Sequence, residues 1–219
     1  MTLQYSRLKA KQRAERDQYH PNASIRIHRA LSWLNRAEAC EDEDGRFVFL
    51  WIAFNAAYAN EVSEEYRVSE QQAFQQFIER LLGYDKHKNL YNLVWAEFPN
   101  SIRALLNNPY VFQPFWDFHN QKTSEADWQE RFDQAKKRAA LALGSQDTQR
   151  VLGIILARLY TLRNQIMHGG ATCGGSVNRQ QLHDANKIMA KLVPIIISLL
   201  MDNASGHWGD PCYPVLTDM

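Results

Sequence analysis

The chain lacks the features that mark secreted, disulfide-bonded and membrane-spanning proteins. It has three cysteines in 219 residues, an odd number without close spacing, which argues against a disulfide scaffold and a structural zinc site. Residues 1–19 are polar and charged, so we do not expect a signal peptide. The longest apolar run near the C-terminus, 192–201, has ten residues and includes Pro194, which is too short to span a bilayer. We therefore expect a cytoplasmic protein with no membrane partner.

A strong net charge is also absent, although the charges are distributed unevenly. The formal net charge is +1, so the whole molecule is not a polycation that coats nucleic acid. Residues 1–36 carry eight lysines and arginines against two acidic residues. Residues 38–70 carry two lysines and arginines against nine acidic residues. Residues 131–191 are basic again, with ten lysines and arginines against three acidic residues. This last segment suits an anionic ligand, although a solvated helix surface would give the same pattern.

Apolar residues recur at helical spacing over most of the chain, and they make up 45% of it, enough for a substantial core. Asn22, Ser124 and Asp147 can each cap a helix, and Gly45 and Gly144 can each end one. The predicted helices comprise residues 22–40, 47–59, 69–82, 88–98, 124–143, 147–168 and 179–201. A strand is the alternative prediction for the apolar segment 47–59, but the length of the segment and its alanines favour a buried helix. The predicted fold class is therefore all-α.

The helices suggest one domain with an elaboration in its middle. Residues 100–120 are irregular in pattern, with prolines among many aromatic side chains. We predict a compact aromatic loop that covers the core there, and a platform that stacks nucleobases is the alternative. The single predicted domain, residues 1–219, has core helices at about 22–62 and 147–201, an elaboration at about 63–146 and a C-terminal strap, 202–219.

The most informative segment is the hexapeptide RNQIMH, residues 163–168, which two glycines follow at the end of a predicted helix. Asn164 and His168 are four residues apart and share a helix face, whereas Arg163 lies about 140° away from His168. Arg163 and His168 would converge if the helix loosened at its end, if the arginine curled toward the histidine, or if it served a neighbouring chain.

Arginine, asparagine and histidine are sufficient to cleave a phosphodiester without a metal. We expect Arg163 to bind the scissile phosphate, Asn164 to orient the reacting groups and His168 to transfer protons. RNA supplies the nucleophile, its 2′-hydroxyl, and a second histidine from another subunit would supply the second proton transfer. The alternative is a pair of basic side chains that only cap the helix carbonyls.

Three further residues are weaker candidates for RNA binding: Arg158, Gln165 and Asn55. Arg158 lies five residues before Arg163 and would either extend an anionic groove or reach solvent. Asn55 would border the site, or form a hydrogen-bonded amide in the core. Cys173 has no base placed beside it by the sequence, and the histidines show no metal-ligand spacing, so we expect no metal and no cofactor.

The sequence resembles the HEPN family (higher eukaryotes and prokaryotes nucleotide-binding). The family motif is an arginine, four to six residues and a histidine, often with asparagine directly after the arginine, and Arg163, Asn164 and His168 match it with four intervening residues. The apolar segment FLWIAFNAAYA, residues 49–59, is similar to the second helix of larger HEPN proteins. The resemblance covers about residues 22–62 and 147–201.

The resemblance implies a HEPN-like helical bundle with an inserted helical and loop elaboration. It also implies a homodimer that brings two motifs together, and RNA cleavage without a metal that leaves a cyclic phosphate. Such proteins often act as toxins or antiviral effectors, and an antitoxin or another regulatory protein is a further expected partner. We therefore predict a metal-independent endoribonuclease. The alternative is a catalytically inactive module of the same family that binds RNA, nucleotide or a partner.

Overall fold

The computed structural model describes residues 4–59, 70–176, 178–206, 208–211 and 213. Over these ranges the regular elements are helices, which confirms the all-α prediction. Within the same ranges we find no helix with the length and apolar character needed to cross a bilayer.

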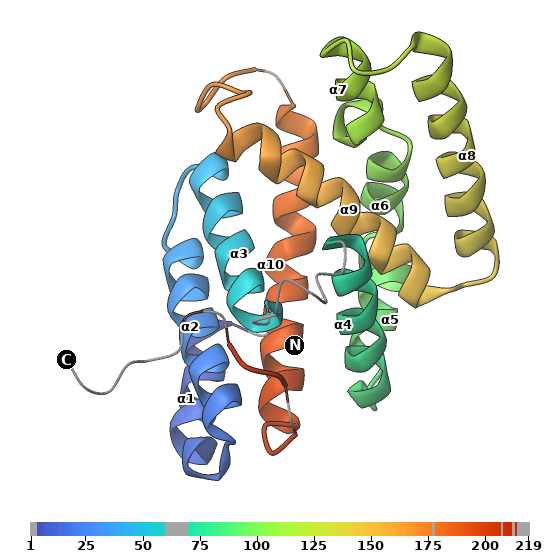
Figure 1. Ribbon diagram of the computed structural model, residues 1–219. Coiled ribbons are helices and arrows are strands. Elements are labelled where there is room, and N and C mark those ends of the chain that lie inside the picture. Colours follow the sequence, from blue (N-terminus) through green and yellow to red (C-terminus); the bar gives the residue numbers. More distant parts are fainter. Residues whose placement is uncertain (1–3, 60–69, 177, 207, 212, 214–219) are drawn as a thin grey trace.

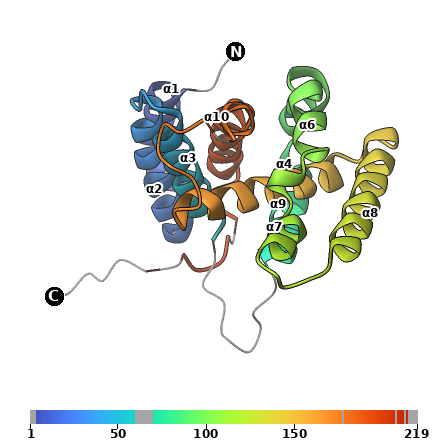
Figure 2. The ribbon, with the colours of Figure 1, turned by 90° about the horizontal axis from the view of Figure 1, so that it is seen from above.

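The helices stand in two groups, and one long helix joins them (Figures 1 and 2). The first group contains α1 (Tyr5–Glu15), α2 (Pro21–Glu38), α3 (Glu43–Tyr58) and α10 (Arg179–Asp202), with the short turn η1 (Arg16–Gln18) after α1. The second contains α4 (Glu70–Tyr84), α5 (Asn89–Asn92), η3 (Leu93–Glu97), α6 (Pro99–Leu106), η4 (Pro109–Val111), α7 (Gln113–His119) and α8 (Glu125–Gly144). The joining helix, α9 (Thr148–Met167), begins beside the second group and ends against α3 (Figure 1).

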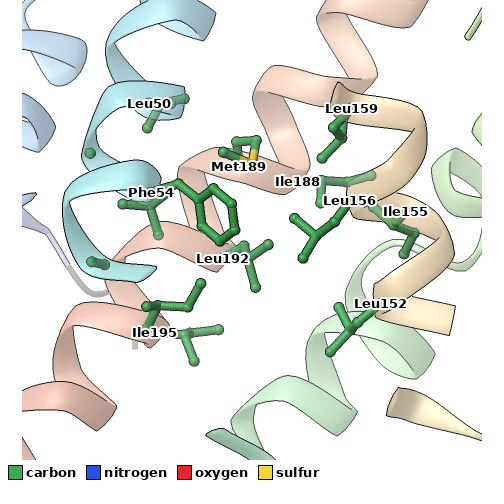
Figure 3. Close-up of a cluster of buried hydrophobic side chains, with 14 of the residues drawn as sticks. Leu50, Phe54, Leu152, Ile155, Leu156, Leu159, Ile188, Met189, Leu192 and Ile195 are labelled. Atoms are coloured by element: carbon green, nitrogen blue, oxygen red, sulfur yellow. The ribbon is translucent and has the colours of Figure 1, made fainter. Parts of the chain in front are cut away.

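The core lies where α3, α9 and α10 meet (Figure 3). Six side chains from these helices are at most 2% exposed there: Leu50, Phe54, Leu156, Leu159, Met189 and Leu192. The almost wholly apolar segment 47–59 is thus part of a buried helix, as predicted, since α3 contacts neighbours on several sides. This packing fixes the end of α9, which carries the candidate site, against α3.

Two predicted helix boundaries in the first group are wrong. The cap of α2 is His20 rather than Asn22, because the His20 Nδ1 accepts the N–H of Asn22 and a proline occupies the first turn. Gly45 does not end a helix. It lies in the first turn of α3, where its N–H donates to the carboxylate of the cap residue Asp42. A Cβ at Gly45 would lie 2.8 Å from both the Asp42 carboxylate and the Cys40 sulfur, which explains the glycine.

The predicted aromatic loop at residues 100–120 is also wrong, because most of it is helical in α6, η4 and α7. Pro99, Pro109 and Pro114 each lie in the first turn of one of these helices. Proline is compatible with that position, since the first-turn N–H groups have no partner within the helix. The aromatic side chains pack together, as in the edge-to-face contact of Phe115 with Trp128 at 5.2 Å between ring centroids.

The helices α8 and α9 begin where the sequence predicts. The Ser124 hydroxyl accepts the N–H of Asp127, and the Asp147 carboxylate accepts the N–H of Arg150 at 2.9 Å. The first residue of the predicted helix 69–82, Ser69, lies outside the described residues, and α4 covers the rest of that prediction. The sequence does not predict the helix α1, because this helix buries only Leu8 and Gln12 and shows little apolar periodicity.

Candidate nucleic-acid site

The predicted catalytic residues lie at the C-terminal end of α9. Arg163 and Asn164 are half-buried in the last turns of the helix, and His168 is the exposed residue that caps it. The helix stops there because Gly169 takes a left-handed conformation, with φ of 71°, that favours glycine. The N–H of Gly170 then donates to the carbonyl of Gln165 at 2.7 Å, which completes a Schellman cap.

Asn164 is hydrogen-bonded to both of the other motif residues. Its side-chain oxygen accepts from the Arg163 guanidinium at 2.9 Å, and its backbone carbonyl accepts the N–H of His168 at 3.0 Å. The Arg163 guanidinium also lies over the ring of Tyr160, 5.9 Å from the ring centroid. Asn164 therefore holds one edge of the guanidinium and the start of the histidine backbone in fixed positions.

Arg163 faces a cleft of about 460 Å³ between α2, α3, α9 and the C-terminal segment, of which residues 208–211 and 213 are described. The cleft combines positive charge, amide and aromatic groups, and no carboxylate lines it among the described residues. Its lining comprises Arg26, Arg29, Trp51, Ile52, Asn55, Ala56, Tyr58, Ala59, Tyr160, Arg163, Pro211 and Tyr213. Three guanidinium groups around one hollow favour an anionic ligand, and the planar aromatic walls suit a ring system.

The two arginines of α2 hold the C-terminal segment against the cleft. Arg26 is 1% exposed, and its guanidinium donates to the backbone carbonyls of Ala59 at 2.6 Å and Asp210 at 2.9 Å. Arg29 donates to the backbone carbonyl of Tyr213 at 2.6 Å. The buried Arg26 thus acts as a structural link, whereas Arg29 lies at the cleft surface and adds to its positive charge.

Asn55 and Arg163 line the same cleft, so the structure brings these two predicted residues together. It does not bring in Gln165, whose amide donates to the carbonyl of Tyr110 at 2.6 Å and whose side-chain oxygen accepts from Asn178 at 2.8 Å. Gln165 instead ties the end of α9 to η4 and to the start of α10. His168 also lies outside the lining of the cleft.

Arg158 is 4% exposed and points away from the cleft. Its guanidinium donates to the carbonyl of Leu106 at 3.3 Å and lies over Phe112, 4.4 Å from the ring centroid. Burial lowers the pKa of this arginine to about 10. A guanidinium covered in this way does not reach a phosphate, so the expected RNA contact at Arg158 has no support in this position.

The cleft also contains residues that the sequence does not single out, namely Arg26, Arg29 and Tyr160. The basic character of residues 1–36 is the one signal that pointed toward the two arginines. Their proximity to Arg163 is tertiary, because more than a hundred residues separate α2 from α9 in the sequence.

The loop that follows His168 is anchored to the start of α3 by Asp44. Both Asp44 oxygens accept from the Arg179 guanidinium at 2.7 Å, and one also accepts the N–H of Gly174 at 3.1 Å. Ligand atoms of Asp44, Asp42 and Cys173 lie within 4.8 Å of one another. Because Arg179 and Gly174 already occupy the Asp44 oxygens, we do not assign a metal to this group.

Asp44→Asn is expected to weaken the protein at neutral pH by roughly 1–3 kcal/mol, since charged hydrogen bonds are lost from a nearly buried group. The Arg179 hydrogen bonds hold the pKa of Asp44 below its ordinary value of 3.8. The contribution of Asp44 is therefore complete above that unfolded-state value and is lost as the pH falls through the folded-state pKa. Urea unfolding of both proteins between pH 3 and 7 would measure it.

The control for this experiment is Asp17→Asn, because the Asp17 side chain is 96% exposed. The difference in unfolding free energy between wild type and Asp44→Asn should shrink below about pH 4, whereas Asp17→Asn should match wild type throughout. A difference for Asp44→Asn that stays constant down to pH 3 would contradict the role given to the carboxylate.

Comparisons with protein-family models, with curated proteins and with solved structures find no match to this chain. Function therefore has to be inferred from the site itself, together with the motif at residues 163–168.

Proposed function

We propose that this protein is a metal-independent endoribonuclease of the HEPN type, with an active site shared between two copies of the chain. One observation carries the proposal: Arg163 lines a cleft with Arg26 and Arg29 that no described carboxylate enters, and the exposed His168 follows one turn later. The cleft supplies phosphate binding, and the histidine supplies a group that can accept or donate a proton.

In the proposed reaction, Arg163 binds the scissile phosphate, with Arg29 adding to the positive charge around it. A His168 imidazole removes the proton from the 2′-hydroxyl, whose oxygen then forms a bond to phosphorus. The bond from phosphorus to the 5′-oxygen breaks, and a second, protonated His168 donates its proton to that oxygen. The products are a 2′,3′-cyclic phosphate and a 5′-hydroxyl, with no oxidant, metal or added water.

The position of His168 supports a two-copy arrangement. It is outside the lining of the cleft that Arg163 enters, and one imidazole does not both accept and donate a proton in a single step. A symmetric homodimer would bring the histidines of both copies to one shared site. Such an enzyme would act in the cytoplasm as a toxin or antiviral effector, with an antitoxin or another protein restraining it.

A second candidate is a module that binds RNA or nucleotide without cleaving it. The observation that favours it is the hydrogen bond from Arg163 to Asn164, which already engages one edge of the guanidinium within the chain. In this case the basic cleft binds phosphate, and His168 serves only as the end of α9. Binding should weaken as salt rises, and no product should form.

The test is incubation of the purified protein with single-stranded RNA in excess chelator, followed by analysis of the ends of the fragments. The double variant Arg163→Ala/His168→Ala, purified in the same way, is the blank. Fragments with cyclic phosphate ends from wild type alone would support the endoribonuclease. RNA that is bound but stays intact would favour the binding module, and RNA that is neither bound nor cleaved would overturn both.

A further inference from the structure

An aromatic pair, the exposed Trp33 of α2 and the half-buried Phe49 of α3, lies between these two helices. Trp33 is 37% exposed, and its indole stacks on the ring of Phe49, with 5.9 Å between centroids and 20° between planes. The Arg36 guanidinium lies over the same phenylalanine, 4.8 Å from the ring centroid. Trp33 is one of five large apolar side chains that are exposed among the described residues, and Phe49 supports its ring from one side.

The aromatic pair lies one helical turn from the cleft. Trp33 follows the cleft residue Arg29 by four positions on α2, and Phe49 precedes the cleft residue Ile52 by three positions on α3. These offsets correspond to about 6 Å and 4.5 Å along the two helix axes. The helices α2 and α3 are antiparallel neighbours (Figure 1). Trp33 and Phe49 are therefore displaced from the cleft in the same direction, toward the turn between the two helices.

His168 lies toward the same end of the cleft. The loop that follows it is fixed to the first turn of α3 by the hydrogen bond from the Gly174 N–H to Asp44, five residues before Phe49. A chain that leaves the cleft past His168 therefore runs toward Trp33 rather than toward the C-terminal segment at the other end of α2.

The charges around this surface suit a polyanion. Residues 25–37 of α2 contain three arginines and no acidic residue, and residues 46–59 of α3 contain one arginine and no acidic residue. The arginines and the exposed indole match the alternation of phosphate and base in a nucleic acid strand, and the acidic residues of the α2–α3 turn, 38 and 41–44, lie beyond them in the sequence.

We propose that Trp33, supported by Phe49, stacks a nucleobase adjacent to the scissile phosphate, so that the substrate of this site is single-stranded RNA. The inference rests on the proposed function, since it extends the same cleft by one nucleotide. Phe49 limits the motion of the indole before RNA binds, so that less conformational entropy is lost on stacking. A duplex keeps its base faces inside its own stack and cannot use this contact.

The experiment compares wild type and Trp33→Ala for binding to a short 2′-O-methyl RNA, which cannot be cleaved, as a single strand and as a duplex. Trp33→Ala should weaken binding of the single strand roughly 5- to 100-fold and leave the duplex unchanged. Trp33→Phe should retain most of the affinity. The salt dependence of binding should not change in Trp33→Ala, whereas Arg29→Ala should reduce its slope by about 1.

The matched control is Tyr91→Ala, an aromatic truncation on α5 in the second helix group, which should bind like wild type. An equal loss for single strand and duplex, or no loss at all, would overturn the stacking role. A Trp33→Ala protein that becomes monomeric in light scattering would assign the indole to contact with a second copy and would also overturn it. If wild type cleaves RNA and Trp33→Ala binds it with unaltered affinity, only the stacking role of Trp33 is contradicted. If wild type binds no RNA, the proposed function is contradicted as well.

Discussion

Arg163→Ala and His168→Ala should each reduce RNA cleavage by about 100-fold or more, because each removes a group that acts on the transition state. An equal mixture of wild type and His168→Ala should keep about a quarter of the wild-type rate if each site uses the histidines of both copies. Half of the dimers are then mixed and contain one intact His168, so only the quarter of the dimers that are wild type in both copies remain active. The measurement is the initial rate of cleavage after the two proteins have exchanged subunits.

This experiment separates a shared site from one that a single chain completes. If Arg163 and His168 act within one protomer, every wild-type chain in the mixture stays active, and the mixture keeps about half of the wild-type rate. The control is Arg150→Ala, which removes another arginine of α9 whose side chain is 61% exposed and pairs with Asp147. Its cleavage rate should stay near wild type. Full activity in either Arg163→Ala or His168→Ala would reject the catalytic assignment.

Arg26→Ala should lower the free energy of unfolding by roughly 2–5 kcal/mol, the largest stability effect that we expect from one side chain. The Arg26 guanidinium is buried and donates to backbone carbonyls at the end of α3 and in the C-terminal segment. Removing it leaves those carbonyls without their donor and opens a void between the two segments. For a chain of this size the midpoint of thermal unfolding should fall by roughly 5–15 °C.

The control for Arg26 is Arg16→Ala, since the Arg16 side chain is 64% exposed and pairs with its neighbour Asp17. It should change the unfolding free energy by no more than about 0.5 kcal/mol. Arg26→Lys should lie between wild type and Arg26→Ala, because an ammonium group keeps the charge but not the planar fork. Equal unfolding free energies for Arg26→Ala and Arg16→Ala would show that the hydrogen bonds of the buried guanidinium do not stabilise the fold.

The helices that the sequence predicted well are those whose signals are local. In α8 and α9 the capping side chains of Ser124 and Asp147 act on N–H groups three residues away, so a short window of sequence contains the whole interaction. The same local rule failed at Gly45 and at Pro109. Glycine and proline are compatible with the first turn of a helix as well as with its end, and only the neighbouring segments decide between the two.

The sequence by itself determined that this chain is helical, that the helix containing residues 47–59 is buried and that one helix ends in arginine, asparagine and histidine. Those properties depend on periodicity and on neighbours a few residues apart. Only the tertiary structure decided that Arg158 is covered by Phe112 while Arg163 faces a cleft with Arg29 and Asn55. The physical reason is that a helical wheel gives the angle between two side chains, but which neighbour each one meets depends on how α2, α3 and α9 pack.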